Sequence, residues 1–185
     1  MSIENEKNVL AVIEKFQAGY SQRNIEEIDN FVKELFVDSE DTLIVGTGSG
    51  EWCKGLKEIK ELVYIDWFYW GNFKLDLDNA YIVVKDDYAT INTTAVLQKE
   101  YEEGKLSEIN VNRLKNIVES DGSNKEKIYQ SLKAMAYFLH EENIGEDVKR
   151  LIRFSALIIR ENDKWKFSNI HFSYPVTPPT DIKLI

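Results

Sequence analysis

The apolar residues of this chain change their spacing near Gly71, and this change constrains the fold more than any other feature of the sequence. Before Gly71, apolar residues recur at the spacing of amphipathic helices. After Gly71, apolar and polar residues alternate, as in residues 73–78, which is typical of half-buried strands. Helices followed by such strands predict an α+β fold in which an antiparallel sheet packs against the amino-terminal helices.

Three helices are predicted before the period changes. The first carries its apolar residues at positions 9–20 and ends close to Asn24. Asn24 is the expected N-cap of the second helix, with Glu27 at the spacing of a capping box. A short strand at 41–45 and a third helix at 56–63 complete this half of the chain.

The second half is predicted to contain two hairpins separated by a helical insertion. The insertion, residues 101–149, is charged and free of proline, and Ser123 and Glu126 in it have capping-box spacing. Turn residues separate the strands of each hairpin, and three prolines after residue 174 end regular structure. The predicted strands are residues 73–84, 88–98, 151–160 and 165–173.

Composition excludes several classes of function. The chain has 185 residues and a formal net charge of −9, and it gathers no cluster of Lys and Arg that could neutralise phosphates. We therefore expect no nucleic-acid partner and no membrane partner. The amino terminus is acidic and no apolar run could span a bilayer, and Cys53 is the single cysteine. These features favour a cytoplasmic protein without disulfides.

Residues 46–71 combine glycines with large aromatic side chains. Three of the four tryptophans, Trp52, Trp67 and Trp70, lie in this segment. Apolar aromatic walls with a few polar groups are typical of small-molecule sites, whereas aromatic residues in a core or a dimer interface are the alternative reading. Tyr20, at the end of the first helix, is a further candidate, since its hydroxyl could project into the same pocket or lie at its rim.

Three ionisable residues are candidates for acid–base chemistry. His171 is the side chain whose ordinary pKa is closest to neutrality. By its period-two position, it is expected on the same strand face as Trp165 and Phe167. Glu51 and Asp66 flank the aromatic segment. A structural histidine and loop carboxylates that bind backbone N–H groups are the more common alternatives.

Other chemistries are disfavoured by the sequence. The glycines at 46–50 are followed by Glu51 rather than by a Gly-Lys-Ser/Thr sequence, which argues against a phosphate-binding loop. His140 and His171 lie on different predicted elements, so no metal site is expected. Cys53 has no assigned histidine partner and is read as an inert thiol. No cofactor is predicted.

The order of elements and several short segments resemble the SnoaL-like, nuclear transport factor 2-like superfamily. These segments are Ile44-Val-Gly-Thr-Gly48, Glu51-Trp52, the helix opened by Gly55, and the closing Trp165-Lys-Phe and His171-Phe-Ser. The resemblance, which is to a bacterial subgroup of largely uncharacterised SnoaL-like proteins, covers nearly the whole chain. It implies a single domain over 1–185, a curved sheet forming a cone around an apolar pocket, and a homodimer formed through the sheet.

Ketosteroid isomerases, which share this architecture, need a carboxylate base and an oxyanion hole made by a tyrosine and a protonated aspartate. The resemblance places Phe16 at the tyrosine position, Val45 or Gly46 at the base and Ser155 near the aspartate. All three positions depart from the pattern, so ketosteroid isomerase activity is disfavoured. Ser155 is nevertheless kept as a residue expected to line the pocket.

The sequence favours a homodimeric SnoaL-like protein that binds a small apolar or aromatic molecule in a cone-shaped pocket. An acid–base enzyme, such as an isomerase, cyclase or hydrolase, is the first alternative, and a dimerising interaction module with a vestigial cavity is the second. Whether the protein is an enzyme stays open at this point. The predicted catalytic residues are His171, Glu51 and Asp66, and the predicted ligand-binding residues are Tyr20, Trp52, Trp67, Trp70 and Ser155.

Overall fold

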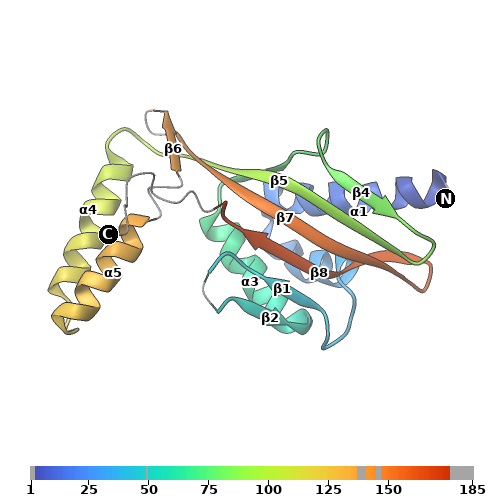
Figure 1. Cartoon of the computed structure of the whole chain (residues 1–185), viewed down its shortest axis with the longest axis horizontal. Helices are drawn as coiled ribbons and strands as arrows, with labels where there is room; N and C mark the ends of the chain where they lie inside the picture. The colour runs from blue at the N-terminus through green and yellow to red at the C-terminus, as the bar shows by residue number, and fades with distance from the viewer. Residues whose placement is uncertain (1–2, 49, 137–140, 145–146, 176–185) are drawn as a thin grey trace, which may run out of the picture. The chain divides into compact units, whose positions relative to one another are not determined.

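The computed structural model describes residues 3–48, 50–136, 141–144 and 147–175. The chain divides into two compact units. Unit 1 comprises residues 1–97 and 152–175, and unit 2 comprises residues 98–151 and 176–185. Figure 1 shows the elements of both units. Within the described residues, no helix is long and apolar enough to cross a membrane.

The amino-terminal helices of unit 1 follow the predicted pattern closely. Helix α1 spans Ile3–Gln22, and the short 3-10 helix η1, Ile25–Glu27, precedes α2, Ile28–Leu35. Asn24, predicted as the N-cap of the second helix, caps η1 instead, and its side chain accepts a hydrogen bond from the backbone N–H of Glu26 at 3.2 Å; the N-cap of α2 is Glu27. The predicted capping box does not form, because the Glu27 carboxylate accepts instead from Nδ2 of Asn30 at 2.8 Å.

Helix α3 spans Gly55–Tyr69 and is longer than the prediction of 56–63. The extra residues carry Asp66 and Trp67, which the helical repeat places on the buried face formed by Ile59, Leu62 and Val63. The backbone N–H of Trp70, the C-cap, makes the last helical hydrogen bond, to the carbonyl of Asp66 at 2.7 Å, and the extended backbone of Trp70 (φ −72°, ψ 153°) ends the helix. This extension determines how the candidate site is assembled.

A mixed sheet packs against these helices. Its strand order is β2-β1-β8-β7-β5-β3, with β4 paired to β5 and β6 paired to β7. The prediction of an antiparallel sheet is correct for β1 with β2, β4 with β5, β6 with β7 and β7 with β8, but β1 runs parallel to β8. In Figure 1 the long strands of unit 1 curve in front of α1 and α3, so the helices cover one face of the sheet. The strands of unit 1 are β1 (Leu43–Val45), β2 (Trp52–Lys54), β3 (Asn72–Leu75), β4 (Tyr81–Val84), β5 (Tyr88–Glu100), β7 (Asp147–Glu161) and β8 (Lys164–Ser173), of which β5 and β7 continue into unit 2.

The predicted strand at 73–84 is interrupted. It forms β3 and β4, and Asp76 between them accepts two hydrogen bonds from the Asn79 side chain and one from its backbone N–H. The hairpin of β4 and β5 forms as predicted, with Val84 opposite Ala89. The closing hairpin of β7 and β8 also forms, and Asn162 and Asp163 in its turn have positive φ values of 49° and 62°. Positive φ at both central residues matches the twist of a two-residue hairpin.

A register shift in the closing hairpin separates its two ends. Leu157 pairs with Asn169, whereas Ile158 pairs with Phe167, so Ser168 is an extra residue on β8. A bulge of this kind reverses the face on which the following side chains lie. Phe167 and Ile170 are therefore both buried, and His171 is exposed.

Aromatic side chains fill the space between the helices and the sheet. The ring of Phe16 in α1 is fully buried and lies 5.1 Å from Phe167 and 5.8 Å from Phe154, centroid to centroid. Tilted and edge-to-face contacts at such distances are the favoured arrangement of aromatic pairs. The other rings around Phe16 are Tyr20, Phe31, Phe36 and Phe73.

Unit 2 contains two helices and a short hairpin. Helix α4 spans Lys105–Glu119 and α5 spans Asn124–Ala136. The capping box of α5 forms as predicted: Ser123 Oγ accepts from the N–H of Glu126 at 3.3 Å, and the Glu126 carboxylate accepts from the Ser123 N–H at 2.8 Å. The prediction of a helical segment over 101–149 is wrong for its last part, because β6 (Glu141–Ile144) pairs with the beginning of β7.

Candidate functional site

Tyr20 and Asp66 form a buried hydrogen-bonded pair. The Tyr20 hydroxyl, at the carboxyl-terminal end of α1, donates to Oδ2 of Asp66 on α3 at 2.9 Å. Tyr20 is 1% exposed and Asp66 is 4% exposed. Buried polar groups are rarely left without partners, and each of these side chains satisfies the other. The sequence singled out both residues but did not predict their contact.

The environment of this pair disfavours charge on either member. Burial raises the pKa of Asp66 to about 8, the hydrogen bond from Tyr20 opposes this increase, and the negative charge of Glu51 adds to it. Burial, followed by the effect of Asp66, raises the pKa of Tyr20 well above its ordinary value. At neutral pH the pair therefore consists mainly of a phenol and a protonated carboxylic acid.

Two tryptophans lie beside the pair. The ring centroid of Tyr20 is 6.3 Å from Trp67 and 5.7 Å from Trp70. Trp67 is buried and lies edge-to-face against Phe31 at 4.9 Å. Among the described residues, the buried Nε1 of Trp67 has no hydrogen-bond partner. The structure thus brings together four of the predicted site residues, Tyr20, Asp66, Trp67 and Trp70.

A groove of about 420 Å³ lies along α1 and α2 on the outer side of this cluster. The rings of Phe31 and Trp67 are its aromatic lining residues, and Gly19 lies next to Phe31. Its remaining lining is mostly polar. These polar residues are Lys15, Gln22, Asn24, Glu27, Asn30 and Glu34. The groove is within the size range of small-molecule sites.

Glu51 and Trp52 lie at the glycine-rich loop. Oε2 of Glu51 accepts from the backbone N–H of Gly48 at 2.6 Å, which is the loop-binding role considered as the alternative to catalysis. A Cβ on Gly46 would lie 2.3 Å from the same oxygen, so a larger residue at this position would displace the Glu51 carboxylate. Trp52, on β2, is 61% exposed. The carboxylate of Glu51 thus occupies the loop where a phosphate would have to bind.

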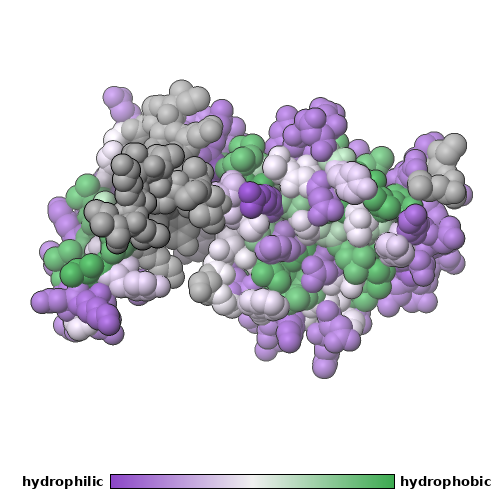
Figure 2. All heavy atoms as spheres, viewed as in Figure 1, coloured by the Kyte–Doolittle hydropathy of each residue, from purple (hydrophilic) through white to green (hydrophobic). Residues whose placement is uncertain are grey.

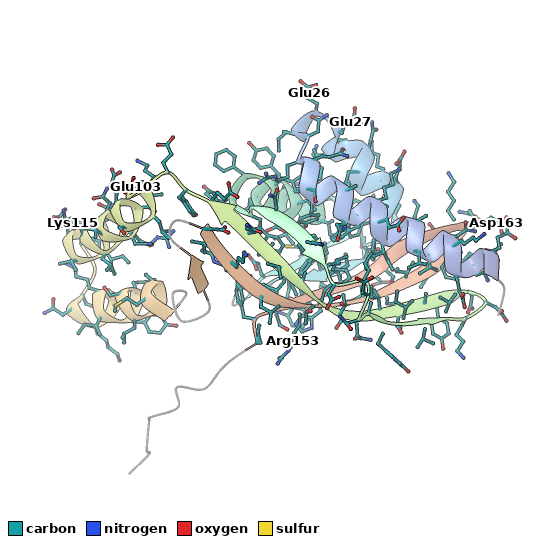
Figure 3. All side chains as sticks on the ribbon, turned by 90° about the horizontal axis from the view of Figure 1, so that it is seen from above. Glu26, Glu27, Glu103, Lys115, Arg153 and Asp163 are labelled. Carbon is teal, nitrogen blue, oxygen red and sulfur yellow. The ribbon has the colours of Figure 1, made fainter. Side chains whose placement is uncertain are left out.

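His171 and Ser155 lie on the face of the sheet that points away from the helices. They are paired across β7 and β8, and their neighbours Phe154 and Phe172 point into the core. Figure 3 shows Arg153, two residues before Ser155 on β7, projecting from the sheet opposite the helices. The expectation that His171 shares a face with Trp165 and Phe167 is wrong, because the extra residue at Ser168 reverses the alternation.

The described residues contain no group of three or more His, Cys, Asp or Glu side chains that could hold a metal ion. Cys53 is half-buried, and burial, with Glu51 as the next cause, raises the pKa of its thiol. A raised pKa lowers the fraction of reactive thiolate. These observations leave the Tyr20–Asp66 pair as the best-developed candidate for chemistry.

Comparison with solved structures identifies the architecture. The chain matches an NTF2-like protein of unknown function from Pseudomonas putida with a TM-score of 0.59 and 12% identity, over 97% of this chain and 93% of that one. The chain has the NTF2-like fold. No protein-family model matches the sequence, and no curated protein matches it.

Two other structures with the NTF2-like fold carry proposed activities. A proposed dehydratase from Streptomyces avermitilis matches with a TM-score of 0.59 and 13% identity, over 94% of this chain and 98% of that one. A proposed ketosteroid isomerase from Shewanella frigidimarina matches with a TM-score of 0.51 and 14% identity, over 88% and 92% of the two chains. At these identities the likeness establishes the fold, and function has to be argued from the site.

Proposed function

We propose that this NTF2-like protein binds a small, uncharged apolar or aromatic molecule in the groove lined by Phe31 and Trp67. The observation that carries the proposal is that a groove of ligand size, with two aromatic rings in a mostly polar lining, is backed by the buried, hydrogen-bonded pair of Tyr20 and Asp66. Because Trp67 contacts both the groove and the pair, a ligand on its ring would lie next to the polar groups.

The lining of the groove supports an uncharged ligand. Gln22, Asn24 and Asn30 offer neutral donors and acceptors at the rim. The charged groups are already engaged, since the Glu27 carboxylate accepts from Asn30 and Lys15 pairs with Glu34. A planar molecule with one or two polar atoms would bury its apolar body against the aromatic rings and keep its polar atoms at the rim.

Replacing Trp67 by leucine tests this proposal against a matched control, Trp52→Leu, which removes an exposed indole from β2. We expect Trp67→Leu to weaken binding of a small aromatic compound by about tenfold or more and Trp52→Leu to leave it within about twofold. Isothermal titration of a panel of neutral aromatic compounds would measure both. Both variants must first show the parent's near-UV circular dichroism. Equal affinities for two folded variants would refute the groove assignment.

Acid–base catalysis is the second candidate, and the protonation state of Asp66 favours it. A carboxylic acid that stays protonated at neutral pH can serve as a general acid, as loss of water or isomerisation of a carbonyl compound requires. Two of the similar structures are a proposed dehydratase and a proposed ketosteroid isomerase. Because Asp66 is 4% exposed, a substrate would reach it only after a side chain that covers it moved.

The two candidates are separated by Asp66→Asn, which keeps the size of the side chain and an acceptor for Tyr20 but removes the acid. A panel of β-hydroxy carbonyl compounds and β,γ-unsaturated ketones would reveal turnover by the parent. If the protein is an enzyme, Asp66→Asn lowers kcat by at least about a hundredfold while ligand binding persists. Turnover that survives in Asp66→Asn, or turnover lost together with binding, would remove the catalytic role.

We also propose that the outer face of the sheet forms a homodimer, as the SnoaL-like resemblance implies. On β7 this face carries Leu157 and Ile159, which are half-buried and alternate with the core residues Ala156 and Ile158. Figure 2 views unit 1 from this side and shows apolar residues interspersed with polar ones. Interfaces are about as apolar as the rest of a protein surface, so this mixed composition is compatible with a dimer. Such a dimer would also suit the alternative reading as an interaction module.

Sedimentation equilibrium at micromolar concentration should give about twice the monomer mass for the parent protein. Leu157→Asp should shift the protein to monomer, because a carboxylate would be buried without a partner across the two-fold axis. Lys57→Asp, on α3, places the same side chain on the helical side and should leave the dimer intact. A parent protein that sediments as a monomer would contradict the proposal.

A further inference from the structure

A second cavity, of about 520 Å³, lies at the other end of the α1–α2 pair. It is bounded by α1, by the last turn of α2 and by the turn of the β7–β8 hairpin. Figure 3 shows Asp163, in that turn, at the end of unit 1 where α1 begins. The cavity shares Lys15 and Glu34 with the groove of Phe31 and Trp67 but has a different floor and a different charge.

Lysines surround this cavity although the protein is strongly acidic. Four lysines line it against two acidic residues, in a chain whose formal net charge is −9. Both acidic groups are already paired. Glu34 binds Lys15, and Asp163 binds Arg160 at 2.8 Å. The other three lysines, Lys33, Lys164 and Lys166, therefore give the cavity an excess of positive charge.

One of these lysines has a structural role. Nζ of Lys166 donates to the backbone carbonyl of Lys33 at 3.0 Å, near the carboxyl-terminal end of α2. A cation at this position satisfies a carbonyl that the helix leaves free and offsets the partial negative charge of the helix end. Lys166 therefore makes the end of α2 compatible with an anion.

Lys33 and Lys164 are exposed, and in the part of the chain that the structure describes neither forms an ion pair. Asp29, whose carboxylate feels the charge of Lys33, is itself bound by Lys60 at 2.6 Å. Two ammonium groups without carboxylate partners at the mouth of one cavity are suited to an anionic group.

The floor of the cavity is apolar. Ala11, Val12, Leu35 and Trp165 line it; Leu35 and Trp165 are buried, whereas Ala11 is exposed and Val12 is half-buried, so these two leave apolar surface open. An inorganic anion would leave this surface uncovered, whereas an anion attached to an apolar body would cover it and gain from its burial. The chemistry of the cavity thus selects an amphipathic ligand.

We propose that this lysine-lined cavity binds an organic anion, with its carboxylate or phosphate group between Lys33 and Lys164 and its apolar body over Ala11 and Val12. This proposal rests on the positive charge of the cavity and on its apolar floor. It does not depend on the proposal that the groove of Phe31 and Trp67 binds an uncharged ligand. Carboxylates and phosphate monoesters share the required chemistry and differ in charge and in number of acceptor oxygens.

Isothermal titration of the full chain at low salt, with 2-naphthoate, 2-naphthyl phosphate and the neutral 2-naphthamide, tests the proposal. We expect at least one anion to bind at least about tenfold more tightly than the amide. A higher salt concentration should weaken the binding of the anions but not that of the amide. The tighter anion identifies the class. Absence of anion binding at millimolar concentration, or equal affinity for the amide, would overturn the proposal.

Paired lysine variants locate the binding. The double variant Lys33→Gln/Lys164→Gln should weaken binding of the anion by about tenfold or more. The control Lys74→Gln/Lys85→Gln removes the same charge from exposed lysines of β3 and of the β4–β5 turn. It should change the affinity for the anion by less than twofold. Equal losses in both pairs would mean that net charge alone attracts the anion and would reject the site. Trp67→Leu should leave anion binding unchanged, which separates this site from the groove.

Discussion

At the scale of single residues, the Tyr20–Asp66 pair is a polar contact inside an otherwise apolar core. Asp66 lies on the same helical stripe as Ile59, Leu62 and Val63, and all three of these neighbours are buried. A carboxylate at such a position would be destabilising, so the core favours the protonated acid, which accepts the Tyr20 hydroxyl. The protonation of Asp66 is therefore coupled to folding.

The first prediction follows from this coupling. The pKa of Asp66 is about 8 in the folded protein and near 4 when unfolded, so the folded state holds more protons between these values. Stability must then fall as pH rises through this window and level off above it. We expect the free energy of unfolding of the parent to decrease by about 3 to 4 kcal/mol between pH 5 and pH 8 relative to that of Asp66→Asn.

Urea unfolding at several pH values would measure this difference. Asp78→Asn, a change at an exposed carboxylate, serves as the control and should follow the parent. If the free energy of unfolding changed with pH in the same way for the parent and for Asp66→Asn, Asp66 would be ionised in the folded protein, contrary to the prediction.

The individual residues of the candidate site were more predictable than their contacts. Asp66, Trp67 and Trp70 could be selected because aromatic walls with a few polar groups are typical of small-molecule sites, and Tyr20 because it lies at the end of the first helix. Their contact depends on α3 continuing to Tyr69, and bulky aromatic residues give only a weak helix signal. The face of the sheet on which His171 lies was predicted wrongly, because the alternation of apolar and polar residues does not reveal the bulge at Ser168.

At the scale of elements, α1 and α2 approach each other closely at Gly19. A Cβ on Gly19 would lie 2.1 Å from Cε2 of Phe31, a distance at which one of the helices or the ring must move. Gly19 has no positive φ, so its role is close packing rather than backbone conformation. The same contact positions Phe31 in the groove beside Trp67.

The second prediction concerns this contact. Gly19→Ala should destabilise the protein by about 1 to 3 kcal/mol through overpacking, although alanine is the better helix former. With Phe31→Leu as background, which removes the ring carbons that clash, the same change should be neutral or stabilising. Thermal unfolding of the parent, the two single variants and the double variant gives the coupling free energy between Gly19→Ala and Phe31→Leu. A destabilisation that is equal in both backgrounds would show that Phe31 is not the cause.

Sequence patterns predicted most elements of unit 1 because its amphipathic helices and hairpins have clear periods and turn residues. Asn162-Asp163 between two apolar runs was sufficient to predict the closing turn. The interruption of residues 73–84 and the parallel pairing of β1 with β8 were not predictable in detail. Both depend on which strands meet in space, and local alternation carries no information on pairing.

At the scale of the whole molecule, the apolar core belongs to unit 1. Among the described residues, no member of its central cluster lies between Leu97 and Ile152. The helices α4 and α5 thus contribute no buried side chain to that cluster, although they occupy a long segment between two adjacent strands. The core packing of unit 1 does not depend on them.

The third prediction is that a short Gly/Ser linker can replace residues 101–146 without loss of the unit 1 fold. The expected result is cooperative unfolding and the near-UV circular dichroism of packed aromatic rings, because the Phe16 contacts all lie within unit 1. A shortened protein that lost its near-UV signal while keeping its far-UV signal would show that the inserted segment is required for packing.

The parallel pairing of β1 with β8 also governs the order in which the molecule can fold. Leu43 pairs with Asn169, and Phe16 packs on Phe167, so the packing of the amino-terminal elements is completed only by the last strand of the sheet. Contacts between residues so far apart in sequence raise the contact order and slow folding. During synthesis at about 5 to 20 residues per second, the apolar faces of α1 and α2 must wait several seconds for β8 to be made. Over that interval part of the apolar surface of these helices stays uncovered by the sheet, which exposes the nascent chain to aggregation.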